Sequence, residues 1–128
     1  MEKKGVLILA EKLPPEVQAK LAQFQQVQEQ LKMILAQKQN VQAELREVES
    51  VLAELEKLPD NIELYKNVGH VLIRTSKENV VKELNERKEI LELRMRTLEK
   101  QEAYLQKQYD ELKRKVTEEL MKTYRAAK

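Results

Sequence analysis

Two stretches of the sequence repeat apolar residues at alternating spacings of three and four, and this heptad pattern limits the possible folds more than any other feature. The repeating positions of the first stretch are Val17, Phe24, Leu31, Lys38, Leu45 and Leu52, together with Lys20, Val27, Ile34, Val41, Val48 and Leu55. Those of the second are Leu84, Leu91, Leu98, Leu105 and Leu112, together with Val81, Lys88, Met95, Glu102, Tyr109 and Val116. Stripes sustained over about five or six heptads predict two helices of a coiled coil.

Prolines bound the first helix. Pro15 suits the first turn of a helix, where its missing N–H has no intrahelical partner. Pro59 disfavours helix in the residue before it, and the Asp and Asn that follow are turn residues. The pattern therefore predicts a helix over residues 15–58.

The second helix has a capping signal at its start. Thr75, with Glu78 three residues later, fits a capping box, and Ser76 is an alternative cap. The heptads continue from there through Val116, so the sequence predicts a helix over residues 76–125.

Between the two stretches the apolar period changes from 3.5 to two, which indicates a β-hairpin over residues 62–75. Gly69 lies where a tight connection needs positive φ. A lone two-stranded hairpin is marginally stable and has open edges, so we expect it to oligomerise with hairpins of other chains. The residues predicted to mediate this are Ile62, Leu64, Tyr65, Val68, Gly69, Val71, Leu72 and Ile73.

Together these elements predict a mainly α fold: a long antiparallel two-helix coiled coil with one central β-hairpin that oligomerises into a shared sheet or a β-barrel body. Heptads by themselves leave open whether the helices pair within one chain or between chains. We predict a single domain over residues 13–128, preceded by a flexible N-terminal arm at residues 1–12.

Composition argues against several function classes. Basic residues number 24 and acidic residues 22, a near balance that argues against a nucleic-acid binder. Cysteine is absent, only one histidine occurs and there is no Gly-rich phosphate loop, so we expect neither an enzyme nor a metal or other cofactor. The apolar run Val6–Ala10 is far shorter than the roughly 20 residues that span a bilayer, so no membrane association is expected.

Apolar residues exceed the needs of the stripes where the start of the first helix should meet the end of the second. Such a surplus predicts a surface for irregular apolar partners, to which Met and aromatic side chains adapt. The alternative is that these residues only close the helix ends. The predicted binding residues are Val17, Leu21, Phe24, Val116, Leu120, Met121 and Tyr124.

Basic residues concentrate near the end of the second helix. They predict docking onto an acidic protein surface, although cations also suit the negative pole of a helix dipole. A nucleic-acid interface is disfavoured because acidic residues lie beside them. The residues are Lys113, Arg114, Lys115 and Lys122.

Several segments resemble beta-class prefoldin of the archaeal type. The similarity covers nearly everything after the arm, and its most discriminating part is the Tyr-Lys-x-Val-Gly motif from Tyr65 to Gly69. The segments that carry it are residues 13–18, 23–26, 62–73 and 81–84.

The resemblance implies an ATP-independent holdase chaperone, a cytoplasmic hexamer of two alpha-class and four beta-class subunits. In that assembly hairpins form a double β-barrel body, and coiled-coil tips hold unfolded polypeptides before transfer to a group II chaperonin. The predicted client-binding, oligomerisation and chaperonin-docking residues are the three sets given above. The arm at residues 1–12 departs from the family pattern. The rival hypothesis is a structural coiled-coil adaptor that binds one folded partner.

Overall fold

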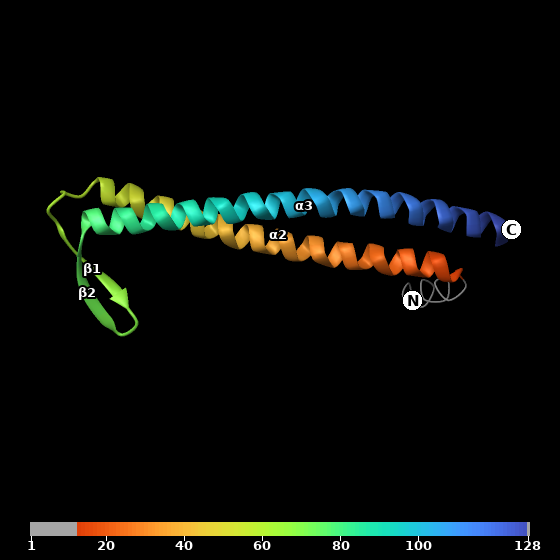
Figure 1. The fold of residues 1–128 in the computed structure, drawn as a ribbon, viewed down its shortest axis with the longest axis horizontal. Coiled ribbons are helices and arrows are strands. Elements are labelled where there is room, and N and C mark those ends of the chain that lie inside the picture. Colours follow the sequence, from red (N-terminus) through yellow and green to blue (C-terminus); the bar gives the residue numbers. More distant parts are fainter. Residues whose placement is uncertain (1–12, 128) are drawn as a thin grey trace. The chain divides into compact units, whose positions relative to one another are not determined.

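The computed structural model describes residues 13–127 and contains two helices and two strands (Figure 1). Their order along the chain is α2 (Pro15–Glu56), β1 (Glu63–Val68), β2 (Val71–Ser76) and α3 (Lys77–Ala127). The predicted N-terminal arm lies outside the described residues. The fold class expected from the sequence, two long helices joined by one antiparallel hairpin, is confirmed.

The chain divides into two compact units, and each is described by itself. Of the described residues, 13–35 and 100–127 form the unit that we call the terminal unit, because it contains the start of α2 and the end of α3. Residues 36–99 form the hairpin unit. Each unit contains part of α2 and part of α3, and the hairpin unit also contains both strands.

Proline and local hydrogen bonds define the start of α2. The carbonyl of Pro14 accepts hydrogen bonds from the backbone N–H groups of Val17 and Gln18, both at 3.0 Å. Pro15 occupies the first helical position, where its missing N–H costs nothing. The Gln18 side chain donates to the carbonyl of Leu13 at 2.8 Å, so the chain just before the helix is held as well.

The end of α2 comes two residues before the predicted boundary, at Glu56. The N–H groups of Lys57 and Leu58 bond to carbonyls three residues earlier, at 3.2 and 3.1 Å, so the last turn tightens into 3₁₀-type geometry. Pro59 explains this change, because it disfavours α-helical geometry in the residue that precedes it.

Ser76 is the N-cap of α3. Its Oγ accepts a hydrogen bond from the backbone N–H of Asn79 at 3.1 Å, and the helix begins at Lys77. Ser76, the alternative cap named from the sequence, is therefore the N-cap. The capping box of Thr75 with Glu78 does not start the helix. Since β2 extends to Ser76, the strand passes directly into α3.

The heptad stripes form the core of each unit. In the hairpin unit the buried apolar residues all occupy predicted stripe positions, and in the terminal unit Leu13 extends the same stripe by one position. Leu91 is fully buried. The buried set comprises Val41, Val48, Leu55, Leu91 and Leu98 in the hairpin unit and Leu13, Val17, Val27 and Val116 in the terminal unit.

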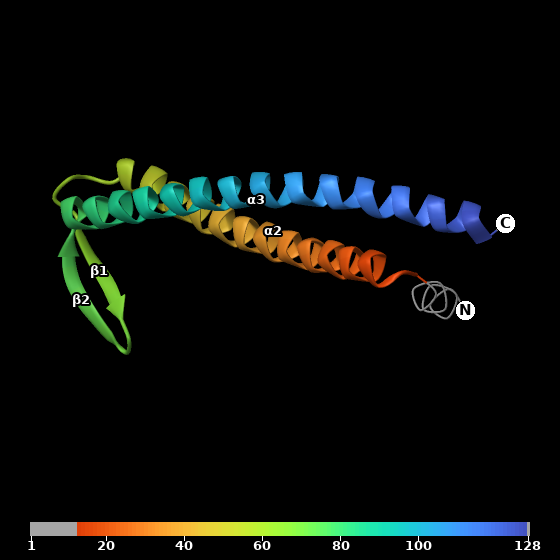
Figure 2. The ribbon, with the colours of Figure 1, turned by 45° about the vertical axis from the view of Figure 1, so that its right-hand side comes forward.

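Contacts inside each unit show that the helices pair within the chain and run antiparallel (Figures 1 and 2). In the hairpin unit, Arg87 donates to Glu44 through Nε at 3.0 Å and Nη2 at 2.6 Å. Lys88, a polar residue on the stripe, lies 3.8 Å from Glu49. Exposed ion pairs of this kind contribute about 0.2–1 kcal/mol each, so the apolar stripe supplies most of the stability. The intrachain pairing settles the choice that the heptads had left open.

Replacing Leu91 with Ala should destabilise the protein by about 2–3 kcal/mol, the lower part of the range for buried leucines, because solvent reaches a two-helix core easily. Its neighbour Ile90 is 51% exposed and provides the control: Ile90→Ala should change stability by less than about 0.5 kcal/mol. Urea unfolding followed by circular dichroism measures both. Equal losses from the two variants would contradict the assignment of Leu91 to the core.

Candidate functional site

The β-hairpin turns through a two-residue loop that depends on Gly69. The strands pair antiparallel from Glu63 opposite Ser76 to Val68 opposite Val71, which leaves Gly69 and His70 as the loop. Gly69 has a φ of 61°, and within residues 13–127 no other residue has positive φ. A positive φ at the first loop residue alone is the signature of a type II′ turn, which matches the right-handed twist of the strands.

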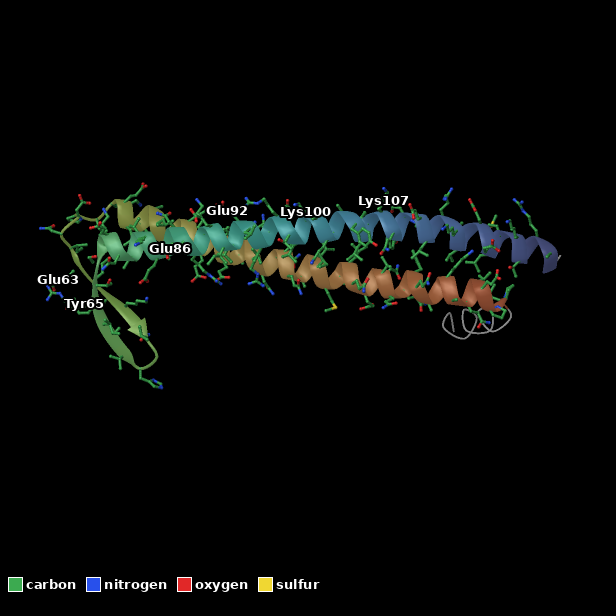
Figure 3. The ribbon with its side chains drawn as sticks, viewed as in Figure 1. Glu63, Tyr65, Glu86, Glu92, Lys100 and Lys107 are labelled. Atoms are coloured by element: carbon green, nitrogen blue, oxygen red, sulfur yellow. The ribbon has the colours of Figure 1, made fainter. Side chains whose placement is uncertain are left out.

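Both faces of this two-stranded sheet carry exposed apolar side chains. Register places Val68, Val71 and Ile73 on one face and Tyr65 and Leu72 on the other. All five are exposed in the chain, and Leu72 is the most exposed at 68%. Figure 3 labels Tyr65 and Glu63 on the strand β1. The remaining predicted members, Ile62 and Leu64, are half-buried. Apolar groups on both faces of an open sheet indicate a surface that another molecule covers.

Ionic contacts join the two strands of the hairpin and attach it to α3. Lys66 of β1 reaches Glu83 of α3 at 2.8 Å, and Arg74 pairs with Glu63 across the two strands. These pairs are solvent-exposed and hence individually weak. Their effect is geometric, because they tie β1 both to β2 and to the first turns of α3.

Lys77 is a positioning residue that the sequence analysis missed. Its side chain is only 14% exposed, and its ammonium donates to the carbonyl of Leu58 at 2.8 Å and to Asp60 Oδ1 at 3.1 Å. The contact joins the connection after α2 to the first residue of α3. A signal was present in the sequence: a lysine at the first helical position opposes the helix dipole, so it needs a compensating partner.

The terminal unit contains all seven predicted binding residues. They fall into a group of four that is buried or half-buried and a group of three that is exposed. Val17 and Val116 are buried at 3% and 5% exposure, and Leu21 and Phe24 are half-buried. Phe24 stacks on Tyr109 with ring centroids 5.0 Å apart. These four residues therefore belong to the packed helix pair.

The other three residues form an exposed apolar surface on the last turns of α3. Leu120 is 38% exposed, Met121 50% and Tyr124 60%. They lie off the heptad stripe, whose positions after Val116 are taken by Glu119 and Thr123, both half-buried. We call Leu120, Met121 and Tyr124 the end surface. It is the part of the predicted binding set that stays accessible in the folded chain.

The predicted basic residues lie on the same part of α3. Lys113, Arg114, Lys115 and Lys122 are all exposed. The ammonium of Lys122 lies 3.8 Å from the carboxylate of Glu119, which is half-buried one turn earlier on the helix. Lys115 lines a shallow groove between the helices of the terminal unit, together with Glu111 and residues that include Gln23, Gln26, Gln30 and Gln108. Lys122 thus lies among the residues of the end surface, and the other three basic residues lie one to two turns before it on α3.

Two kinds of site are absent from the part of the chain that the structure describes. Across residues 13–127, neither helix has an apolar stretch long enough to cross a membrane. In the same part of the chain, no group of three or more His, Cys, Asp or Glu residues is placed to hold a metal ion.

The fold and its exposed surfaces define a class: a coiled-coil subunit that carries one β-hairpin with apolar groups on both faces. A family model described as "Prefoldin subunit" matches residues 18–123. The prefoldin beta subunit of Saccharolobus islandicus is 52% identical over 116 residues, which cover 91% of this chain and 92% of that protein. The beta subunit of Sulfurisphaera tokodaii is 49% identical, with coverage of 91% and 93%.

A solved structure supports the same family as these relatives. The crystal structure of the prefoldin beta subunit from Thermococcus strain KS-1 superposes with a TM-score of 0.79 at 42% identity, covering 85% of this chain and 96% of that one. The chain therefore belongs to the prefoldin family of chaperones, and within it to the beta class. This confirms the family resemblance read from the sequence.

Gly69→Ala should weaken the hairpin by about 1–2 kcal/mol, the cost of holding an L-residue at positive φ. A Cβ at this position would meet nothing within 4 Å, so the backbone conformation alone causes the loss. Gly69→Asn should cost less, because Asn tolerates positive φ better than Ala does. Amide hydrogen exchange of residues 63–76 measures local opening, and equal protection in both variants would contradict the turn assignment.

Proposed function

We propose that the chain is the beta subunit of an ATP-independent holdase, which captures non-native proteins at the end surface and passes them to a group II chaperonin. The observation that carries the proposal is the exposure of Leu120, Met121 and Tyr124 on one short stretch of α3. Exposed apolar patches on proteins mark binding sites, and Leu, Met and Tyr side chains adapt to partners without fixed shape. Membership of the prefoldin chaperone family supports the same conclusion.

Capture of this kind is weak at each end surface and strong in combination. Burying one large apolar side chain yields at most about 1.5–3 kcal/mol, and these three are already partly covered. A single subunit therefore releases its client readily. When several subunits hold one client, the linked contacts raise the overall affinity by roughly 10²–10⁴. No step in this mechanism consumes ATP or needs a cofactor.

The remaining members of the predicted client-binding set have a supporting role in this proposal. Val17 and Val116 are buried in the helix pair, so they hold the end surface in place from beneath. Leu21 and Phe24 are half-buried and extend the apolar area along α2. This assignment narrows the client-contacting residues to the exposed part of the set.

Assembly proceeds through the hairpins in the same proposal. The exposed faces around Tyr65, Leu72 and Ile73, and the open edges of the two strands, support pairing with hairpins of other subunits. The partners are alpha-class subunits and further beta chains, in a hexamer of two alpha and four beta subunits whose hairpins form a double β-barrel. The complex acts in the cytoplasm.

Transfer of the client uses the basic side chains near the end surface. Lys113, Arg114, Lys115 and Lys122 are exposed and suit docking on an acidic chaperonin surface. Charge complementarity of this kind speeds encounter more than it raises affinity. The contact therefore favours rapid transfer without a long-lived complex.

Replacing Leu120, Met121 and Tyr124 together with Ser should abolish protection of a chemically unfolded protein from aggregation, in the complex with alpha subunits and without ATP. Val17 is left intact, because its burial means that a serine there would damage the helix pair itself. The matched control replaces Leu35, Met33 and Tyr104 with Ser. These side chains are 48%, 61% and 64% exposed in the same unit. Light scattering measures aggregation.

The proposal requires the control complex to protect like the original. If the end-surface variant protects as well as the control, client capture does not use this surface. If the unmodified complex gives no protection, the chain is a coiled-coil adaptor for a folded partner.

Replacing Leu72 and Ile73 with Ser, one on each face of the sheet, should weaken assembly with alpha subunits by at least roughly tenfold per residue. Both side chains are exposed in the single chain, so its own helix content should not change. Leu93→Ser, at a helix position that is 58% exposed in the same unit, is the control. Native mass spectrometry reports the assembly, and an intact hexamer in the double variant would refute hairpin-mediated association.

A further inference from the structure

The groove between α2 and α3 in the terminal unit has polar rims over an apolar floor. Val27, which is buried, and Leu112, which is half-buried, form the floor. Residues 18–30 of α2 contain six glutamines and only two charged residues, Lys20 and Glu29. One rim is therefore neutral and rich in side-chain amides. The rims are formed by Gln23, Gln26 and Gln30 of α2 and by Gln108, Glu111 and Lys115 of α3.

These glutamines stand where a coiled coil usually has charged residues. Positions that flank the apolar stripe commonly form ion pairs between helices. The hairpin unit follows this rule, because Arg87 and Glu44 occupy flanking positions and bond to each other. Gln23 and Gln30 lie three and two heptads before Glu44, at the same heptad position. Within residues 13–127 their amides have no hydrogen-bond partner, so they do not hold the helices together and are available to a ligand.

A side-chain amide offers the groups that pair with a polypeptide backbone. Glutamine presents both an N–H donor and a C=O acceptor, as a peptide bond does. Moving a neutral amide out of water also costs far less than moving an ion. Folded proteins have nearly all their buried backbone groups paired, whereas an unfolded chain presents them without partners. The α2 rim is therefore complementary to the backbone of an unfolded chain, whatever its side chains are.

The spacing of the rims fits an extended chain. Gln26 and Gln30 are four residues apart, which is about 6 Å along α2, and Glu111 and Lys115 have the same spacing on α3. An extended strand turns N–H and C=O groups to the same side every two residues, or about 6.8 Å. Flexible glutamine side chains take up the small difference. From Gln23 to Gln30 the groove is about 10 Å long, which accommodates about three extended residues.

We propose that this groove binds the extended backbone of a non-native protein through the amides of Gln23, Gln26 and Gln30. It is separate from the end surface, because Lys115 and Leu120 lie about 8 Å apart along α3 and about 140° apart around it. The end surface selects apolar side chains, and the groove selects unpaired peptide groups. Together the two contacts favour unfolded over folded proteins. This role rests on the capture function proposed above.

Backbone N-methylation tests the proposal, because it removes the N–H donors of a peptide and leaves its side chains unchanged. The probes are a short dye-labelled peptide of Leu, Ser and Thr and the same peptide with N-methyl groups on alternate residues. Fluorescence anisotropy measures the affinity of each for the complex with alpha subunits. We expect the unmethylated peptide to bind more tightly.

The groove variant carries Gln23→Met, Gln26→Met and Gln30→Met, which keep the length of the side chains and remove their amides. Its preference for the unmethylated peptide should fall roughly fivefold, the effect of about one net hydrogen bond. The matched control carries Gln25→Met, Gln101→Met and Gln106→Met, at exposed positions of the same unit that do not line the groove, and should keep the full preference. An unchanged preference in the groove variant would overturn the proposal.

The same assay separates the groove from the end surface. The variant with Leu120, Met121 and Tyr124 changed to Ser should bind both peptides more weakly and keep the preference. Loss of the preference in that variant would place the backbone contact at the end surface and refute the groove. If every complex binds the two peptides equally, the groove proposal fails and capture at the end surface stands. If no complex binds either peptide, the groove proposal also fails, and the aggregation assay described above decides the holdase function independently.

Discussion

Burial of the heptad stripes between α2 and α3 is the interaction on which the rest of this structure depends. Every buried residue of the described chain lies on the stripe, and no other apolar core is present within residues 13–127. Area burial of this kind outweighs the exposed ion pairs that flank it, such as Arg87 with Glu44. Because the stripe uses nearly all buried apolar area, apolar residues off the stripe stay at the surface.

That division explains where the two candidate functional surfaces occur. The hairpin interrupts the helices and has no helix partner to cover both its faces, so Tyr65 and Leu72 stay exposed. At the end surface, α3 continues beyond the start of α2 within the terminal unit (Figure 1), and its stripe positions become polar at Glu119 and Thr123. Met121 therefore lies outside the buried stripe and stays exposed. The exposed faces of the hairpin and the end surface both lie where the heptad stripe ends, so no facing stripe covers their apolar side chains.

Local sequence signals predicted the elements well because they act over short distances. Period 3.5, period two and the glycine of the turn specified two helices and a hairpin, and the structure contains them. What the sequence did not specify is local hydrogen bonding: the end of α2 at Glu56, the choice of Ser76 between two possible caps, and the contact of Lys77 with Leu58 and its neighbour Asp60. Such details depend on which groups meet in space, and periodicity does not encode that.

The sequence by itself determined the family, the fold class and the residues that surround each candidate site, because heptads and the hairpin motif are local and specific. Only the tertiary structure decided which of those residues are accessible. Val17 and Leu120 are both apolar and close to helix ends, yet one is 3% exposed and the other 38%. The difference arises from the antiparallel register, which gives Val17 a facing stripe, whereas Leu120 lies off the stripe near the end of α3.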